Sequence, residues 1–353
     1  MDETSIASLI ETSVLPQYEG LGPGASARLF GSGLINRTYL VEDGDKKFVL
    51  QWVNPIFPTT IHDNIEAVTR HLEAKGMWTP HLVRTRQGKL CLELGARGVW
   101  RLLTHVGGFS FDVISSARQA QAAGALVGRF HAALDSLAHT FICQRLGVHD
   151  TPKHLERLHL AVSSKPDHRL AGAVRGLAEP LLARAAQMPP LPALPDRICH
   201  GDLKFNNILF AGPEGAAAEQ PVCLIDLDTI APMSLAFEVG DAWRSWCNRN
   251  GENNAVAAVD LDVFAASLEG YREGFERPLT TEERTALLLG VEWISLELAA
   301  RFAADAVFEN YFGWDPSKFP GRGEHNLLRA QGQWSLHQAL FDGRAARARL
   351  LGL

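Results

Sequence analysis

The stretch HGDLKFNNILF, residues His200–Phe210, is the most informative part of this chain. It places polar residues between two apolar runs, with Asp202, Lys204 and Asn207 at fixed offsets. Apolar runs that form a core do not accommodate charged and amide groups without partners, so this pattern indicates a site. His-Gly-Asp alone, or Asn-Asn alone, would equally fit an ordinary turn. The combination at one spacing is what points to a function.

A second acidic motif follows on the next apolar run, Cys223–Asp228. If that run is a strand throughout, alternate residues point to the same face, so we expect Asp226 and Asp228 on one side. The small-residue segment 211–220 between the two motifs is predicted to be a hairpin loop.

The two motifs together have the spacing of the protein-kinase catalytic loop, H-x-D-x-x-x-x-N. Phosphoryl transfer needs positioning, charge neutralisation and a group that receives the nucleophile's proton. We predict that Asp202 accepts the hydrogen bond of a substrate hydroxyl and that Lys204 meets the transferred phosphate. Asn207 and Asp226 are hard oxygen ligands suited to Mg²⁺, and Asp228 is predicted to be a second metal ligand or a structural anchor.

His200 is expected to support this loop through hydrogen bonds rather than to take part in chemistry. A small buried apolar role is expected for Cys199, which precedes it.

Composition sets the broad class. The chain has 353 residues, 46% hydrophobic and 21% charged, enough for two folded lobes. Its net charge of −6 gives no reason to expect nucleic-acid or anionic-membrane binding. The five cysteines form no C-x-x-C pair, which disfavours zinc and fits a reducing compartment. Without a basic, apolar leader or a run of about 18 apolar residues, we expect a cytoplasmic protein without an obligate protein partner.

The pattern of apolar residues and turns along the chain predicts an α+β protein with two lobes. Strand-like runs at 27–30, 38–42 and 48–53 form a meander, a helix spans about 60–75, and further strands fill 81–106. Gly107-Gly108 marks a joint. We therefore divide the chain into a nucleotide-binding lobe, 1–106, and a catalytic and substrate-binding lobe, 107–353, which is helical apart from the hairpin with the polar motifs. A ligand is expected between the lobes.

The glycine turn at 31–38 (GSGLINRT) lets backbone N–H groups approach phosphates, although a plain hairpin turn has the same composition. The predicted nucleotide contacts are Gly31, Gly33, Asn36, Thr38, Gln51, Thr104 and Val106. In protein kinases the third strand carries a lysine that pairs with phosphates, whereas this chain has Gln51 there. Either Gln51 contacts the nucleotide as a neutral group or another cation does this work.

These features resemble the aminoglycoside phosphotransferase family, a kinase-like superfamily that includes choline and homoserine kinases. Its catalytic and Ile-Asp-x-Asp motifs match His200–Asn207 and Ile225–Asp228. Over nearly the whole chain the sequence is similar to the N-acetylhexosamine 1-kinase group, through GLINRTY at 33–39, FVLQ at 48–51, Val239-Gly240-Asp241, Arg301-Phe302 and EHNL at 324–327. Leu34 departs from that group, in which a histidine is expected. The resemblance implies a kinase-like two-lobe fold and an ATP- and Mg²⁺-dependent kinase of the anomeric hydroxyl of a sugar.

Residues that bind the acceptor are predicted in the C-terminal part of the chain. Arg301 and Asp305 are four residues apart on a predicted helix, so they share a face and either pair with each other or face a substrate. Tyr311 is able to stack on a sugar or to join the core, and Asp241 and Arg244 allow the same two interpretations. With the resemblance, all five are taken as substrate-binding residues.

Other hypotheses stay open. The same fold serves acceptors such as aminoglycosides, choline or homoserine, although the arginines of the C-terminal part favour a neutral acceptor over a polycation. A catalytically silent pseudokinase that binds nucleotide is the third hypothesis.

Overall fold

The computed structural model describes residues 3–31, 35–142 and 148–353. Internal contacts divide the chain into two compact units. The first comprises residues 1–107 and 136–144, and the second comprises 108–135 and 145–353. The predicted joint at 107–108 coincides with this division, while the return of 136–144 to the first unit was not expected. Whether the units are the nucleotide-binding and catalytic lobes stays a prediction.

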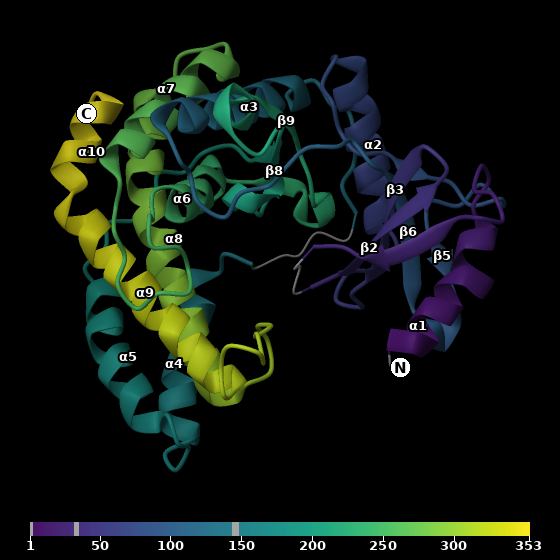
Figure 1. Ribbon diagram of the computed structural model, residues 1–353. Coiled ribbons are helices and arrows are strands. Elements are labelled where there is room, and N and C mark those ends of the chain that lie inside the picture. Colours follow the sequence, from purple (N-terminus) through teal and green to yellow (C-terminus); the bar gives the residue numbers. More distant parts are fainter. Residues whose placement is uncertain (1–2, 32–34, 143–147) are drawn as a thin grey trace. The chain divides into compact units, whose positions relative to one another are not determined.

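The first unit is built on an antiparallel sheet in the order β1-β2-β3-β6-β4, with β5 paired to β6. Figure 1 shows the unit in purple and blue. Its strands are β1 Ser26–Leu29, β2 Arg37–Asp43, β3 Lys46–Val53, β4 Leu82–Val83, β5 Leu92–Glu93 and β6 Val99–Thr104. The predicted meander and the predicted helix, α2 Ile61–Ala74, are confirmed.

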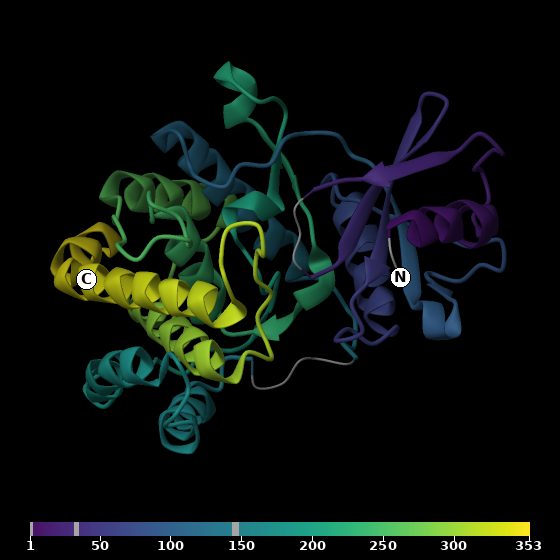
Figure 2. The ribbon, with the colours of Figure 1, turned by 60° about the horizontal axis from the view of Figure 1, so that its bottom comes forward.

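One face of this sheet is closed by the N-terminal segment. Helix α1, Glu3–Leu9, continues through a π-helical turn at Ile10–Val14. Its Ile6 and Ile10 pack against Leu50, Trp100 and other residues from alternate positions of the strands. Helix α2 lies on the other side of the sheet (Figures 1 and 2). The period of two along each strand therefore separates two faces with different neighbours.

The second unit is mainly helical. Its helices are α3 Ala117–Leu134, α4 Thr151–Ser164, α5 Ala171–Ala185, α6 Leu235–Trp246, α7 Leu261–Phe275, α8 Thr281–Phe308, α9 Arg322–Asp342 and α10 Arg344–Leu351. Helix α8 is apolar on nearly every side and is enclosed by α4, α5, α6 and α9, as expected for a central helix. Thr280 and Glu283 form a capping box at its start. None of the helices that the structure describes is long and apolar enough to span a membrane.

Two short strand pairs carry the polar motifs. β7 Arg197–Cys199 pairs with β10 Ala231–Met233, and β8 Ile208–Phe210 pairs with β9 Pro221–Leu224. The predicted hairpin is confirmed as β8–β9, and its 211–220 connection contains a 3-10 turn, Gly215–Glu219. The sequence pattern did not predict the β7–β10 pair, since each strand has only three residues.

Helices α3 and α7 pack so closely that glycines are required at their contact. A Cβ built on Gly270 would lie 1.8 Å from the backbone oxygen of Gln121, and one on Gly124 would lie 2.1 Å from that of Ser267. Backbone atoms cannot give way as a flexible side-chain end does, so each added methyl group would force the two helices apart.

We expect Gly270→Ala to lower the free energy of unfolding by about 1–3 kcal/mol, because the methyl group overpacks this contact. Gly176→Ala in α5 is the matched control, since a Cβ there meets nothing within 4 Å. It should raise stability by about 0.5–1 kcal/mol through the better helix propensity of alanine. Urea denaturation of both variants measures the difference, and equal effects would contradict the proposed close contact.

Candidate active site

The loop after β7 has a backbone that few sequences permit. Gly201 has φ +80°, and a Cβ on it would lie 2.6 Å from the carbonyl oxygen of Thr229. The hydroxyl of Thr229 donates to the carbonyl of His200 at 2.8 Å. Glycine is therefore needed for both conformation and space, and the chain reverses just before Asp202.

His200 joins the two acidic motifs. Its Nδ1 accepts from the backbone N–H of Asp202 at 3.3 Å, and its Nε2 donates to the carbonyl of Ile225 at 2.8 Å. A neutral imidazole with the proton on Nε2 satisfies both bonds. The ring is fully buried, so it supports the loop as predicted and holds Asp202 next to the end of the Asp226 segment.

Glu238 on α6 is the strongest anchor of this loop, and the sequence pattern did not identify it. Its carboxylate accepts the backbone N–H groups of His200 at 2.7 Å and Gly201 at 2.9 Å. His131 Nε2 donates to the same carboxylate at 3.2 Å, while His131 Nδ1 faces the hydroxyl of Tyr271 at 3.0 Å. Burial alone raises the pKa of Glu238, but His131 and the backbone donors outweigh it and lower that pKa.

Asp202 and Lys204, the predicted catalytic residues, form an ion pair. Lys204 Nζ lies 3.1 Å from Asp202 Oδ1 and 3.2 Å from Oδ2. Burial raises the pKa of Asp202, but the charge and hydrogen bond of Lys204 and the charge of Arg244 lower it overall. The Asp202 charge in turn raises the pKa of Lys204. At neutral pH the pair thus offers a carboxylate able to accept a hydrogen bond beside an ammonium group able to meet a phosphate.

The predicted metal ligands Asn207 and Asp226 belong to the same loop and to the segment after β9. Asn207 sits in the 3-10 turn Phe205–Asn207 and donates from Nδ2 to the carbonyl of Asp202 at 2.8 Å, while its backbone carbonyl accepts from the N–H of Ile225 at 2.9 Å. Asp226 is exposed and has a left-handed backbone, φ 64° and ψ 61°. For a residue other than glycine this conformation costs energy and often marks a functional position. The side-chain oxygens of Asn207 and Asp226 are the hard donors that Mg²⁺ takes, so these residues fit such an ion.

One expectation about this region is wrong. Strand β9 ends at Leu224, and Asp228 lies in a 3-10 turn, Leu227–Thr229. Asp226 and Asp228 therefore do not share a strand face: Asp226 is exposed and Asp228 is buried. The left-handed residue breaks the period of two on which the expectation rested.

A network of alternating charges surrounds Asp202 and Lys204. Arg244 donates to Asp241 Oδ1 at 2.7 and 2.9 Å and to Glu252 at 3.1 Å, and Arg329 lies 3.4 Å from the other oxygen of Glu252. Burial raises the pKa of Glu252, while Arg244, Lys204 and Arg329 lower it overall. Within the part of the chain that the structure describes, Asp241 Oδ2 is buried without a hydrogen-bond partner. Glu252 and Arg329 were not predicted as site residues.

The predicted pair of Arg301 and Asp305 has a different arrangement. Arg301 pairs with Glu297, one turn earlier on α8, at 3.4 Å, and its guanidinium lies 5.7 Å from the centre of the Tyr311 ring. Glu297 also accepts from Thr151 at 2.6 Å. Burial raises the pKa of Glu297, while His149 and Arg301 lower it overall. Arg301 thus lies beside Tyr311, whose hydroxyl it approaches at 3.4 Å and which is 52% exposed.

Asp305 is committed to the backbone of the following turn. Its carboxylate accepts from the N–H groups of Asn310, Tyr311 and Phe312 at 2.9–3.0 Å and from the side chain of Asn326 at 2.9 Å. It is 1% exposed. We therefore expect it to position Tyr311 rather than to contact a substrate, in contrast to the role we predicted for it.

The predicted nucleotide residues lie in the first unit. Gln51 Nε2 donates to Thr38 at 3.2 Å, and Asn36 Oδ1 accepts from the N–H of Asn54 at 2.9 Å. Thr104 accepts from the N–H of His81 at the end of β6, and Val106 follows in extended chain. Gly31 has φ +80° at the start of its turn.

Gly33 and Leu34 lie outside the described residues, so the glycine turn and the effect of Leu34 stay predictions.

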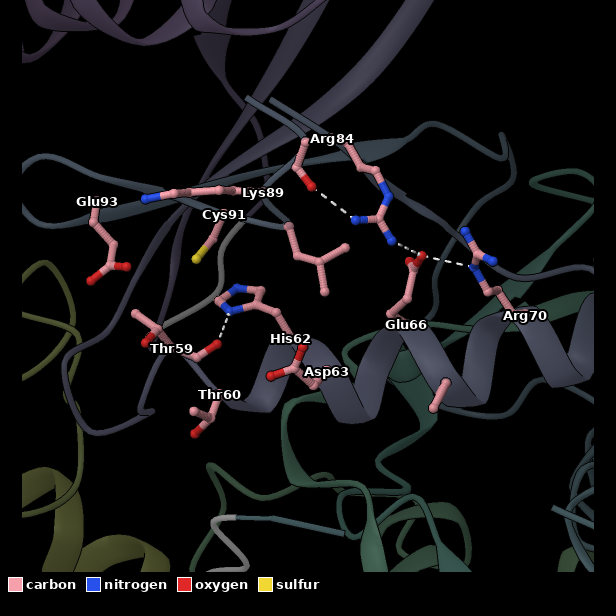
Figure 3. A pocket seen from close by; sticks show the side chains of 13 residues that line it. Thr59, Thr60, His62, Asp63, Glu66, Arg70, Arg84, Lys89, Cys91 and Glu93 are labelled. Carbon is pink, nitrogen blue, oxygen red and sulfur yellow. Dashed lines mark hydrogen bonds and ion pairs between the residues drawn. The ribbon is translucent and has the colours of Figure 1, made fainter. Parts of the chain in front are cut away.

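A pocket of about 570 Å³ lies elsewhere, between α2 and the segment 84–93 (Figure 3). Glu66 holds two arginines on its wall, Arg70 at 2.8 Å and Arg84 at 2.6 Å. None of the predicted site residues lines it. We therefore assign this pocket no role in the chemistry.

We expect Glu238→Gln to destabilise the second unit by about 2–4 kcal/mol, because the amide group places a donor against a buried N–H donor. Hydrogen exchange at His200 and Gly201 should accelerate selectively. Glu292→Gln is the control: Glu292 is equally buried but pairs with Arg344 and Arg347. Identical exchange of the two amides in both variants would contradict the anchoring role.

Comparison with known proteins identifies the family. Residues 26–277 match the APH phosphotransferase enzyme family. A homoserine kinase of Pseudomonas aeruginosa strain UCBPP-PA14 is 28% identical over 255 residues, 71% of this chain and 73% of that protein. Amicoumacin kinase in complex with AMP-PNP, Ca²⁺ and Ami has a similar fold, with a TM-score of 0.61 at 13% identity over 96% of this chain and 94% of that one. A choline kinase from Cryptosporidium parvum Iowa II has a TM-score of 0.57 at 12% identity, with full coverage of both chains. The kinase-like two-lobe fold predicted from the sequence is confirmed, and the chain belongs to the APH phosphotransferase enzyme family.

Proposed function

We propose that this phosphotransferase is a Mg²⁺- and ATP-dependent kinase of a small alcohol that carries no net charge. The family supplies the reaction class, and the proposed residue roles follow from the geometry around Asp202. A cytoplasmic location, where ATP is plentiful, belongs to this proposal.

In the proposed reaction Asp202 orients the acceptor hydroxyl and receives its proton as the oxygen attacks the γ-phosphorus, while the bond from that phosphorus to the bridging oxygen breaks and ADP leaves. Lys204, held 3.1 Å from Asp202, stabilises the charge on the transferred phosphoryl group. Asn207 and Asp226 would hold Mg²⁺, with Asp228 as a buried anchor behind them. The metal supplies neutralisation of phosphate charge.

The alternating network of charges near Asp202 is the observation that supports our choice of acceptor. Three carboxylates, Asp202, Asp241 and Glu252, are matched by Lys204, Arg244 and Arg329. A polycationic acceptor would meet three cations here, and like charges in a partly buried site cost binding energy. A neutral polyhydroxyl compound or a zwitterion would meet donors and acceptors of both signs. Asp241 Oδ2, which is buried and has no hydrogen-bond partner among the described residues, would accept a hydrogen bond from such a ligand.

Two acceptor classes remain, and different observations support them. The curated relative is a homoserine kinase, and a zwitterionic amino alcohol of that class suits paired charges of both signs. The anomeric hydroxyl of a hexose or N-acetylhexosamine, predicted from the sequence resemblance, is the second candidate. The comparisons do not support it specifically, but the exposed Tyr311 ring beside Arg301 would suit the apolar face of a sugar. We give the amino alcohol precedence.

A screen of ADP release with Mg·ATP tests the proposal. The panel contains homoserine and related amino alcohols, free hexoses, N-acetylhexosamines, choline and an aminoglycoside. We expect turnover with a zwitterionic or neutral acceptor and at least about tenfold lower kcat/KM for the polycation. A preferred aminoglycoside would refute the charge argument. With a sugar acceptor, loss of reducing power in the product identifies transfer to the anomeric oxygen.

Substitutions separate the two proposed parts of the reaction. Asp202→Asn should retain Mg·ATP binding but lower kcat by about 10²–10⁴-fold, since it removes the proton acceptor. Asp226→Ala should instead weaken Mg·ATP binding by at least about tenfold, measured by calorimetry at fixed free Mg²⁺. Near-normal turnover of Asp202→Asn would exclude its role as base. Unchanged Mg·ATP affinity of Asp226→Ala would exclude its role as a ligand.

A further inference from the structure

Arg329 on helix α9 connects two segments of the second unit that lie far apart in the sequence. Its Nε lies 3.4 Å from Glu252, in the loop between α6 and α7, and 3.4 Å from Asn253 Oδ1, to which it donates. Its Nη1 donates to the carbonyl of Gly313, in the segment after α8, at 2.9 Å. The residue is 6% exposed, so these contacts are largely shielded from solvent. One guanidinium group therefore holds the two segments together.

Glu252 links Arg329 to Asp241 by way of Arg244. The second oxygen of Glu252 accepts from Arg244 Nη1 at 3.1 Å. The other two guanidinium nitrogens of Arg244, Nε and Nη2, both donate to Asp241 Oδ1. Arg244 is buried, and each of its three nitrogens is thus committed. The Asp241 carboxylate is therefore able to turn only if Arg244 moves with it. Its Oδ2 is the atom that we propose for a hydrogen bond from the acceptor.

The segment after α8 is held from the same turns of α9. Asn326 precedes Arg329 by three residues, so the two side chains share a face of the helix. Asn326 donates to the Asp305 carboxylate at 2.9 Å, and that carboxylate accepts the N–H groups of residues 310–312. Arg329 binds the carbonyl of the next residue. The backbone is therefore fixed on both sides of the exposed Tyr311 ring.

His325, also on α9, joins the same two segments. Its Nδ1 accepts from the N–H of Asp315 at 3.4 Å, and its Nε2 donates to Asn253 Oδ1 at 2.7 Å. Burial and the charge of Arg329 lower the pKa of His325 to about 4. The ring is therefore neutral at neutral pH, with one nitrogen that accepts and one that donates, as these two bonds require.

We propose that Arg329 is a positioning residue for the acceptor, because it fixes both the Asp241 carboxylate and the turn that carries Tyr311. The proposal rests on the proposed function, in which these two groups meet the acceptor. A guanidinium group suits this role because its planar fork donates in several fixed directions at once, whereas an ammonium group is a point charge on a flexible stem. Removal of Arg329 would also leave the half-buried Glu252 with one cation in place of two.

Steady-state kinetics separates this positioning role from a general loss of structure. Homoserine and N-acetylglucosamine are the two acceptors, each varied at saturating Mg·ATP, and Mg·ATP is varied in turn. Arg329→Met should raise the KM of the acceptor at least about tenfold and leave the KM of Mg·ATP within about twofold, because only acceptor-binding groups are displaced. Arg329→Lys should recover part of the loss, since it restores a charge beside Glu252. An equal rise in both KM values, or no rise in folded Arg329→Met, would overturn the proposal.

Arg157→Met on α4 is the matched control. Arg157 donates to Asn310 Oδ1 at 2.9 Å and so binds the same segment after α8, but through an exposed hydrogen bond. This variant should change neither KM by more than about twofold, because surface substitutions have small effects. A tenfold rise in the acceptor KM of Arg157→Met would mean that any disturbance of the segment suffices, which would contradict a specific role for Arg329.

A double-mutant cycle tests whether Arg329 acts through Glu252. Glu252→Gln keeps the size of the side chain but removes the negative charge between the two guanidinium groups, so it should raise the acceptor KM as Arg329→Met does. If both act through one path, their effects on KM do not multiply in the double variant. Full multiplication of the two effects would overturn the proposed path. If Arg329→Met fails to fold, Glu252→Gln and Arg329→Lys decide the question.

Hydrogen exchange tests the link without an acceptor. Glu252→Gln should accelerate exchange of the amides of residues 310–315 at least about fivefold, because a loosened Arg329 releases that segment. Unchanged exchange there would overturn the link between the two segments. Failure of the wild type to turn over either acceptor would instead count against the proposed function, and the exchange rates would still decide whether Arg329 links the two segments.

Discussion

A single buried carboxylate sets the geometry on which the candidate active site depends. Glu238 takes up the backbone N–H groups of His200 and Gly201, which would otherwise be buried without partners next to a left-handed glycine. His131 and Tyr271 in turn hold that carboxylate from α3 and α7. The close packing of α3 and α7 at their glycines therefore also affects the loop, because it positions the side chains of His131 and Tyr271. As a consequence the orientation of the Asp202 side chain is fixed, and Lys204 is able to pair with it.

Charge balance is the second organising constraint. Carboxylates and guanidinium groups alternate from Asp241 through Arg244 and Glu252 to Arg329, so each buried charge has an opposite neighbour. The free energy cost of burying such a network is low because its charges nearly cancel. Under the proposed function it would also offer both signs to a ligand, which is why we expect it to disfavour a polycation relative to a zwitterion or a polyol. In the first unit Arg101 is buried as well, and it donates a hydrogen bond to the side chain of Gln51 at 2.8 Å.

How well the sequence predicted a feature depends on how close in the sequence the residues that determine it lie. Strands β1 to β3, helix α2 and the β8–β9 hairpin were predicted because period-two and helical patterns, with their turns, are local. The same-face expectation for Asp226 and Asp228 failed because one left-handed residue ends the strand pattern. Arg301 and Asp305 share a helix face as predicted, yet each finds another partner, Glu297 and the 310–312 backbone. Spacing along a helix limits which residues meet but does not select among them.

The sequence by itself determined the reaction class and supplied the candidate catalytic and metal-binding positions. Asp202, Lys204, Asn207 and Asp226 stand at spacings that chain connectivity largely imposes, since they lie within one loop and the hairpin after it. The tertiary structure decided what holds and surrounds them. Glu238 lies 36 residues from Asp202, and Arg101 lies 50 residues from Gln51. No local pattern links such residues, because their contacts arise only when helices pack and strands take their register.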